Sequence, residues 1–397
     1  MIHEILLPGR IVIGLGAFAE VGALAAGLGS KVLIVSDPVM ERIGHVDACR
    51  RYLEQAGLAC AVYSGVDTEP TDRHVDAALA VCRQEQCDVL VALGGGSCID
   101  AAKAAAVMMT NTGVIADYAG GAKRFASKPL PLIAIPTTAG TGSEVTKVTV
   151  IIDTRTDVKL MIAQPELVPQ AAIVDAQLSM SCPPSVIASS GIDALCHAIE
   201  AYWSRKANTV TDGWALQAIG LLVKHLPNCY SGKGQADDFA QIALGSMLAG
   251  AAFSNASVTL IHGMSRPIGA LFHVPHGISN AMLLPAVLEF TADDAAERLA
   301  VIGRLMRPDL SEQGSAVLSA AVIEEVKALC RLLRIPNLRD WGLDREAFEQ
   351  ALPKMAADAI ASGSPGNHPR TVTAEEIETL YRVCYDYEFQ MNEGAAL

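Results

Sequence analysis

Imidazole side chains are concentrated in one short segment of this chain. Three of its nine histidines, His262, His273 and His276, lie close together in the sequence IHGMSRPIGALFHVPHG. Far upstream, Asp193 and His197 are four residues apart in the helical pattern GIDALCHAIE, so both side chains face one side of the predicted helix. One carboxylate oxygen and three imidazole nitrogens suit Zn²⁺ or Fe²⁺. The candidate metal ligands are Asp193, His197, His262 and His276.

The sequence around these histidines favours a metal site over a chance spacing of histidines. An aspartate and a histidine four apart occur on many helices, so an ordinary helix face remains the alternative for that pair. His262 and His276 lie in apolar, uncharged sequence, where an unpaired imidazole would be costly. We expect the glycines and prolines of this segment to break the helix and bring the histidines to a bend. They are Gly263, Pro267, Gly269, Pro275 and Gly277.

Two glycine-rich turns compete for the phosphates of a dinucleotide. GLGAFA, residues 14–19, fits the pattern G-x-G-x-x-A before a helix, although a tight turn into an ordinary helix is the alternative. GGGS ends a predicted buried strand and begins a helix, whose free N–H groups and positive dipole end favour a pyrophosphate, with simple turn packing as its alternative. Its residues are Gly94, Gly95, Gly96 and Ser97. The loop IPTTAGTGSE follows another predicted strand and adds Thr137, Thr138, Thr141 and Ser143.

A carboxylate ends the predicted strand KVLIVSD. Asp37 at that position can accept a hydrogen bond from a ribose hydroxyl and repels a 2′-phosphate, which favours NAD over NADP. The alternative is an N-cap for the next helix, and that role does not exclude the first.

The pattern of elements predicts what positions these residues. Short apolar runs at 31–37, 58–65, 88–96, 131–138 and 171–175 alternate with helical stretches, which predicts an α/β dinucleotide-binding domain with a doubly wound, mostly parallel sheet. Residues 147–163 indicate a hairpin with DTRTD as its turn. After SCPPS the strand signals disappear and helical spacing dominates. We therefore place the α/β domain at 1–181 and an all-helical, metal-binding domain at 182–397.

Composition excludes some classes of partner. A net charge of −13 argues against a nucleic-acid or anionic membrane surface. The stretch 239–265 carries no charge and is long enough to span a bilayer, but its polar residues favour a buried helix pair in a soluble core. The ten cysteines form no C-x-x-C pair and the opening MIHEILLPGR lacks a signal peptide's apolar region, so we expect a cytoplasmic protein with reduced thiols.

Four segments together resemble the iron-containing (group III) alcohol dehydrogenases, whose fold is similar to that of dehydroquinate synthase. They are GIDALCHAIEAY, AFSNASVTLIHGMSRPIGALFHVPHGISNAMLLP, GGGSCIDAAK and PTTAGTGSEVT. The resemblance implies an active site between the two domains, with the four ligands given above around Fe²⁺ or Zn²⁺. It implies NAD, with NADP less favoured, bound by Asp37, by residues 95–97 and 137–141, and by Lys159. It also places the pyrophosphate at GGGS, which leaves GLGAFA as an ordinary turn.

The resemblance implies hydride transfer between a small alcohol or aldehyde and the nicotinamide, with the metal as a Lewis acid on the substrate oxygen, in a homodimer or larger homo-oligomer. Three alternatives remain. They are a dehydroquinate synthase-like lyase using NAD and a metal, a metal hydrolase using the same ligands, and a non-catalytic NAD- or metal-binding protein.

One residue departs from the family pattern. Where many relatives carry a histidine able to relay a proton, as in HGMAHPLG, this chain has Arg266, which stays protonated at neutral pH. His273 is a candidate to replace that relay. Arg266 is itself a candidate to bind a carboxylate, sulfonate or phosphonate on the substrate. The alternative is structural, with Arg266 pairing a nearby acid and holding the bend before Pro267.

Overall fold

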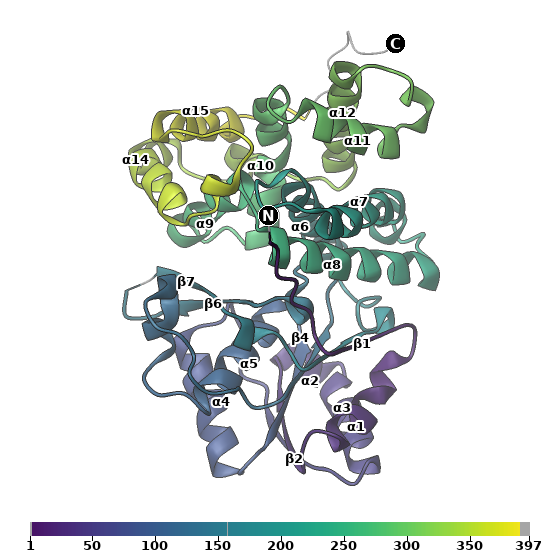
Figure 1. The fold of residues 1–397 in the computed structure, drawn as a ribbon, viewed down its shortest axis with the longest axis vertical. Coiled ribbons are helices and arrows are strands. Elements are labelled where there is room, and N and C mark those ends of the chain that lie inside the picture. Colours follow the sequence, from purple (N-terminus) through teal and green to yellow (C-terminus); the bar gives the residue numbers. More distant parts are fainter. Residues whose placement is uncertain (1, 157, 390–397) are drawn as a thin grey trace. The chain divides into compact units, whose positions relative to one another are not determined.

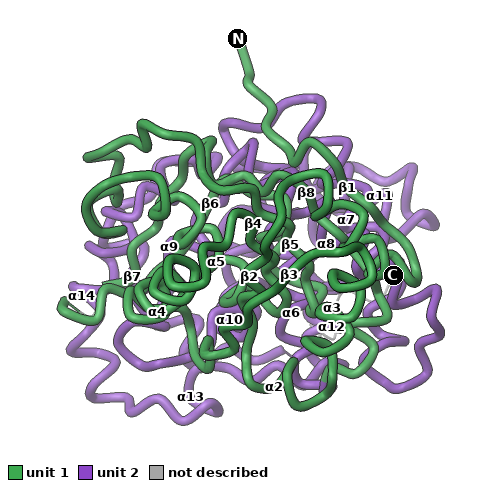
Figure 2. Tube along the Cα trace, turned by 90° about the horizontal axis from the view of Figure 1, so that it is seen from below, with its two compact units in different colours: residues 1–182 green, residues 183–397 purple. Residues whose placement is uncertain are grey.

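The computed structural model describes residues 2–156 and 158–389. The chain divides into two compact units, residues 1–182 and residues 183–397, drawn in green and purple in Figure 2.

The first unit is built on a six-stranded parallel sheet in the order β1-β8-β5-β4-β2-β3. Five strands correspond to the five apolar runs, and β1 is an additional edge strand. The predicted α/β domain with a mostly parallel sheet is confirmed. The strands are β1 (Arg10–Ile13), β2 (Lys31–Val35), β3 (Ala59–Tyr63), β4 (Val89–Gly94), β5 (Leu132–Pro136) and β8 (Ala171–Val174).

Helices cover both faces of this sheet because its central strands are apolar on both sides. Leu33 and Val35 of β2 pack in one core with α4 (Asp72–Gln84) and α5 (Gly96–Met108). Val32 and Ile34 pack in the opposite core with α1 (Val21–Ala26) and α3 (His45–Gln55). Figure 1 shows these helices around the strands. The helices are α1 (Val21–Ala26), α2 (Pro38–Arg42), α3 (His45–Gln55), α4 (Asp72–Gln84) and α5 (Gly96–Met108). Shorter 3₁₀ segments are Ala17–Glu20, Ile115–Gly121, Ser143–Val145, Pro165–Leu167 and Ala176–Leu178.

A separate two-stranded antiparallel sheet forms the predicted hairpin. It joins β6 (Val148–Asp153) to β7 (Val158–Ala163). Asp157, the last residue of the predicted DTRTD turn, lies outside the described residues.

All the regular secondary structure in the described part of the second unit is helical, as predicted. Its central helices are apolar around most of their circumference, and they are buried accordingly. The α-helices are α6 (Pro184–Trp203), α7 (Thr209–Tyr230), α8 (Ala236–Ala256), α9 (Leu260–Phe272), α10 (His276–Thr291), α11 (Ala296–Met306), α12 (Ser315–Leu332), α13 (Leu338–Trp341), α14 (Arg345–Ala361) and α15 (Ala374–Tyr385). Pro308–Leu310 and Pro365–Asn367 are 3₁₀ segments.

Helix α9 corrects one prediction about the histidine segment. We expected Gly263, Pro267, Gly269, Pro275 and Gly277 to break the helix. Helix α9 continues through the first three and ends at Phe272, and Gly277 lies inside α10, so only Pro275 is at a break. Pro267 removes one intrahelical hydrogen bond, and the helix stays intact because both sides of the proline are packed in the core. The chain turns only at 273–275, between α9 and α10.

The uncharged stretch 239–265 falls on α8 and the start of α9. Among the described residues no single helix is long and apolar enough to cross a membrane, while the pair α8 and α9, bent by 101°, meets the length and composition criterion together.

Candidate metal and cofactor sites

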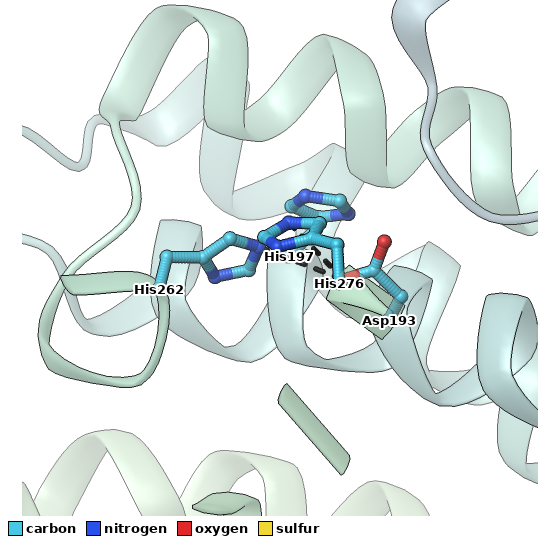
Figure 3. A group of neighbouring side chains, drawn as sticks. All are labelled: Asp193, His197, His262 and His276. Carbon is cyan, nitrogen blue, oxygen red and sulfur yellow. Dashed lines mark ion pairs between the residues drawn. The ribbon is translucent and has the colours of Figure 1, made fainter. Parts of the chain in front are cut away.

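Three helices of the second unit bring the four candidate ligands together (Figure 3). Asp193 and His197 are one turn apart on α6, His262 is on α9, and His276 is the first residue of α10. One ligand atom from each of the four lies within 4.8 Å of the others. The Nε2 atoms of His262 and His276 lie 3.6 Å and 4.0 Å from Asp193 Oδ1. The arrangement is a compact set of one oxygen and three nitrogens, which fits a tetrahedral or more highly coordinated divalent ion.

Close helix packing produces this convergence. A Cβ added to Gly277 would lie 2.7 Å from the backbone oxygen of Ser189 on α6, so only glycine lets the start of α10 approach α6 so closely. The ring of His197 stacks on that of Phe253, with centroids 4.2 Å apart, and on that of His262 at 4.5 Å. Packing therefore fixes the ring planes.

The electrostatics of the cluster favour a bound cation. Burial alone would raise the pKa of Asp193, but the three histidines hold it well below its usual range. Burial alone would lower the pKa of His262, but Glu200 and Asp193 outweigh burial and raise it to about 8. The ionised Asp193 is 2% exposed, so it needs positive charge beside it.

Glu200 was not among the residues predicted from the sequence. It is fully buried on α6 and accepts a hydrogen bond from Nδ1 of His262. Its other oxygen accepts from Thr259 Oγ1 and from the Ile261 amide, each at 2.7 Å. Carboxylates commonly orient metal-binding imidazoles in this way. The available signal was spacing, because Glu200 follows His197 by three residues on the same helix face.

Two further side chains that the sequence analysis missed contact the ligands. Asn280, one turn after His276 on α10, donates from Nδ2 to Asp193 Oδ1 at 2.7 Å. The Ser265 hydroxyl lies 3.4 Å from Nδ1 of His276. A polar shell therefore surrounds Asp193, His262 and His276.

Arg266 and His273 occupy different environments. Arg266 lies one turn after His262 on α9 and is partly buried. Burial lowers the pKa of its guanidinium to about 10, with the charge of Glu200 opposing the shift, so Arg266 remains a cation at neutral pH. His273 caps the C-terminus of α9 with a φ of 55° and is exposed. It is not one of the four clustered residues.

In the first unit, the candidate cofactor residues gather where the direction of the strand connections reverses. From β2 the chain passes outward to β3, whereas from β4 it passes to β5 on the other side. Asp37 directly follows β2, and Gly94 ends β4. Ligands of open parallel sheets bind at the carboxyl ends of strands at such a switch point.

The GGGS turn forms the start of α5. Its N-cap, Gly95, provides no side-chain hydrogen bond to the first turn of the helix. The N–H groups of Gly96 and Ser97, in the first turn of α5, therefore have no capping side chain at Gly95 and point out of the N-terminus, where the helix dipole is positive. This geometry suits a pyrophosphate.

Asp37 caps the neighbouring helix α2. Its Oδ1 accepts from the amides of Val39 and Met40 at 2.8 Å and 3.0 Å. Its Oδ2 lies 3.5 Å from the thiol of Cys98. The N-cap role considered for Asp37 is present, and Oδ2 retains further acceptor capacity for a ribose hydroxyl.

The threonine-rich loop lies beside GGGS. The amide of Thr137 donates to the carbonyl of Gly94 at 3.0 Å, while Thr138 and Thr141 are partly exposed. The hydroxyl of Ser143 is buried and donates to Asp100 at 2.6 Å. Lys159 on β7 forms an ion pair with Glu69 at 2.7 Å.

GLGAFA lies away from the switch point, after the edge strand β1. The amide of Phe18 donates to Asp175 Oδ2 at 3.0 Å, so this turn is closed by the protein's own carboxylate.

Comparison with known proteins gives matches along almost the whole chain. The model of the iron-containing alcohol dehydrogenase family matches residues 8–176, and that of the Fe-containing alcohol dehydrogenase family, C-terminal, matches residues 187–385. A 1,3-propanediol dehydrogenase of Klebsiella pneumoniae is 37% identical over 390 residues, covering 96% of this chain and 98% of that protein.

Solved structures agree with these matches. The crystal structure of a 1,3-propanediol oxidoreductase is similar with a TM-score of 0.93 and 35% identity, covering 97% of this chain and 100% of that one. The sulfoacetaldehyde reductase of Bifidobacterium kashiwanohense in complex with NAD⁺ is similar with a TM-score of 0.86 and 28% identity, covering 98% and 100%.

Proposed function

The chain belongs to the iron-containing alcohol dehydrogenase family and is an oxidoreductase, and we propose that it transfers hydride between NAD and a small alcohol or aldehyde. Family membership implies dependence on a metal and a nicotinamide cofactor. The observation that carries the proposal is the convergence of one carboxylate and three imidazoles within 4.8 Å in a buried cluster. The family match favours this reading over the dehydroquinate synthase-like lyase.

We assign Asp193, His197, His262 and His276 to one divalent ion, Fe²⁺ or Zn²⁺. Such an ion supplies a Lewis acid for the substrate oxygen. The protein's own groups hold this centre: Asp193 stays ionised, and Glu200 fixes the ring of His262.

We assign the cofactor to the switch point of the sheet. The N-terminus of α5 and the GGGS turn would hold the pyrophosphate, with Thr137, Thr138 and Thr141 beside it. Asp37 would accept from the adenosine ribose and disfavour the 2′-phosphate of NADP. Lys159 would contact the cofactor after exchanging its partner Glu69. Ser143 would support the loop through Asp100.

We propose that the substrate carries an acidic group recognised by Arg266. Two observations support this: the partly buried guanidinium, one turn after His262 on α9, keeps its charge at neutral pH, and one structural relative is named as a sulfoacetaldehyde reductase. A purely structural Arg266, held by the charge of Glu200, is the competing role. Since Arg266 cannot relay a proton at neutral pH, His273 is the candidate relay.

A direct test follows NADH absorbance with a panel of short alcohols and aldehydes, using protein stripped of metal and protein reloaded with Fe²⁺ or Zn²⁺. Turnover that requires both metal and NAD would support the proposal. Metal-dependent hydrolysis or elimination without net NADH change would indicate the hydrolase or lyase alternative. Binding of NAD and metal without any turnover would indicate a non-catalytic protein.

A further inference from the structure

Asn280 is not one of the four candidate ligands, yet its side-chain amide contacts three of their ligand atoms. It is fully buried on α10. Its Nδ2 lies 2.7 Å from Asp193 Oδ1, 3.1 Å from His262 Nε2 and 3.3 Å from His276 Nε2. One amide nitrogen therefore contacts three of the four atoms assigned to the metal.

The orientation of this amide follows from the chemistry of its neighbours. The carboxylate of Asp193 can only accept hydrogen bonds. In a neutral ring of His262, Nδ1 donates to Glu200, which leaves a lone pair on Nε2. A reversed amide would place its oxygen 2.7 Å from the carboxylate oxygen of Asp193, so Nδ2 faces inward whatever the protonation of His262.

With Nδ2 facing the ligand atoms, the amide oxygen of Asn280 lacks a hydrogen bond within the described part of the chain. Oδ1 of Asn280 is buried and has no hydrogen-bond partner in the described structure. An unsatisfied buried acceptor is unfavourable. The contacts of Nδ2 with the ligand atoms must therefore outweigh that loss, which points to a role for these contacts.

A bound ion would change these contacts unequally. The unprotonated imidazole nitrogen has one lone pair, which cannot be shared between an N–H group and an ion. A carboxylate oxygen has further lone pairs and can serve both. Ion binding would thus replace the contacts of Asn280 with His262 and His276 and leave its contact with Asp193 in place.

We infer that Asn280 is a positioning residue, which holds Asp193, His262 and His276 together before the ion binds and holds Asp193 afterwards. By keeping the mutually repelling acceptor atoms in place, it raises the affinity of the site for the ion. This inference rests on the proposed function, because it takes the four residues as ligands.

The test measures Co²⁺ binding to metal-stripped full-length protein against a chromophoric chelator at about pH 9, where imidazoles are neutral. Asn280→Leu keeps the branched shape of the side chain, with a larger volume, and removes the donor. We expect its Co²⁺ dissociation constant to rise about 10- to 100-fold. Val287→Ala, a control at a fully buried position on the same helix, should stay within about threefold of wild type.

A second readout concerns the metal-free state. Nitrogen NMR of the histidine rings should show altered Nε2 resonances for His262 and His276 in Asn280→Leu but not in Val287→Ala, since only the first loses the amide donor.

Cobalt affinity of Asn280→Leu within about threefold of wild type would overturn the inference. If circular dichroism shows that this variant does not fold, Asn280→Ser is judged by the same criterion. Failure of the proposed metal site itself looks different, because His262→Ala would then bind Co²⁺ as tightly as wild type.

Discussion

The ring of His262 lies between two buried carboxylates: Nδ1 donates to Glu200, and Nε2 is 3.6 Å from Asp193 Oδ1. This places two negative charges around one imidazole inside the second unit. A cation at the cluster would balance them, and Glu200 at the same time fixes which ring nitrogen faces the cluster.

Replacing His262 by alanine should remove a metal ligand. For His262→Ala we expect metal content to fall sharply and turnover to be abolished, measured by elemental analysis and NADH absorbance. His3→Ala, at an exposed histidine outside the cluster, is the matched control and should retain both. Full metal occupancy in His262→Ala would show that the ligand assignment is wrong.

Glu200 should affect the metal without binding it. Glu200→Gln removes the charge that orients His262, so we expect metal affinity to fall about 10- to 100-fold while the ligands remain. Chelator competition measures this, with the exposed Glu346→Gln as control. Equal affinities for the two variants would assign Glu200 a packing role only.

The stability of the metal-free protein should depend on pH through His262. Its pKa is raised to about 8 from the ordinary 6.5, so the protonated ring stabilises the fold fully below about pH 6.5, and this contribution is lost as the pH rises through about 8. The difference in Tm between wild type and Glu200→Gln should therefore be larger at about pH 6 than at about pH 9. A difference that does not change with pH contradicts the assignment to His262.

Cofactor choice should depend on Asp37. Asp37→Gly removes the repulsion of a 2′-phosphate and should improve the use of NADP relative to NAD, measured as the ratio of kcat/KM values. Glycine is tolerated at N-caps at a cost of only a few tenths of a kcal/mol, so α2 should persist. A wild-type enzyme that already prefers NADP would contradict the argument.

Arg266 should discriminate between substrates by charge. Arg266→His, compared with wild type on an acid-bearing aldehyde and on a neutral one of similar size, should lose roughly 1.5–3 kcal/mol of transition-state stabilisation on the acid alone. Equal losses on both aldehydes would indicate a structural role for Arg266.

The sequence carried enough information for the parallel sheet, the helical second unit and the convergence of the four candidate ligands. The period of the apolar residues and the local composition predict the strands and helices. The spacing of four residues places Asp193 and His197 on one face of α6. The edge strand β1 was absent from the predicted strands. It begins with a charged residue and is only partly buried, unlike the equally short β8, which is fully buried.

Predictions failed where tertiary packing overrides local preference. Gly263, Pro267 and Gly269 are helix breakers in isolation, yet α9 remains whole inside the core. Glu200 and Asn280 were missed because their spacing from His197 and His276 places them on the same helix faces but does not show which side chains they contact. The contacts of Glu200 with His262 and of Asn280 with Asp193 exist only after α6, α9 and α10 have packed.

The four candidate ligands lie on α6 and on the consecutive helices α9 and α10, so about eighty residues of chain separate Asp193 from His276. An ion held by all of them would act as a reversible cross-link that closes the long loop between Asp193 and His276, and closing such a loop lowers the entropy of the unfolded chain. Metal loss would then lower the local stability of α9 and α10 together, as one cooperative segment. The supply of metal would therefore control how well this part of the chain resists proteolysis, in addition to controlling catalysis.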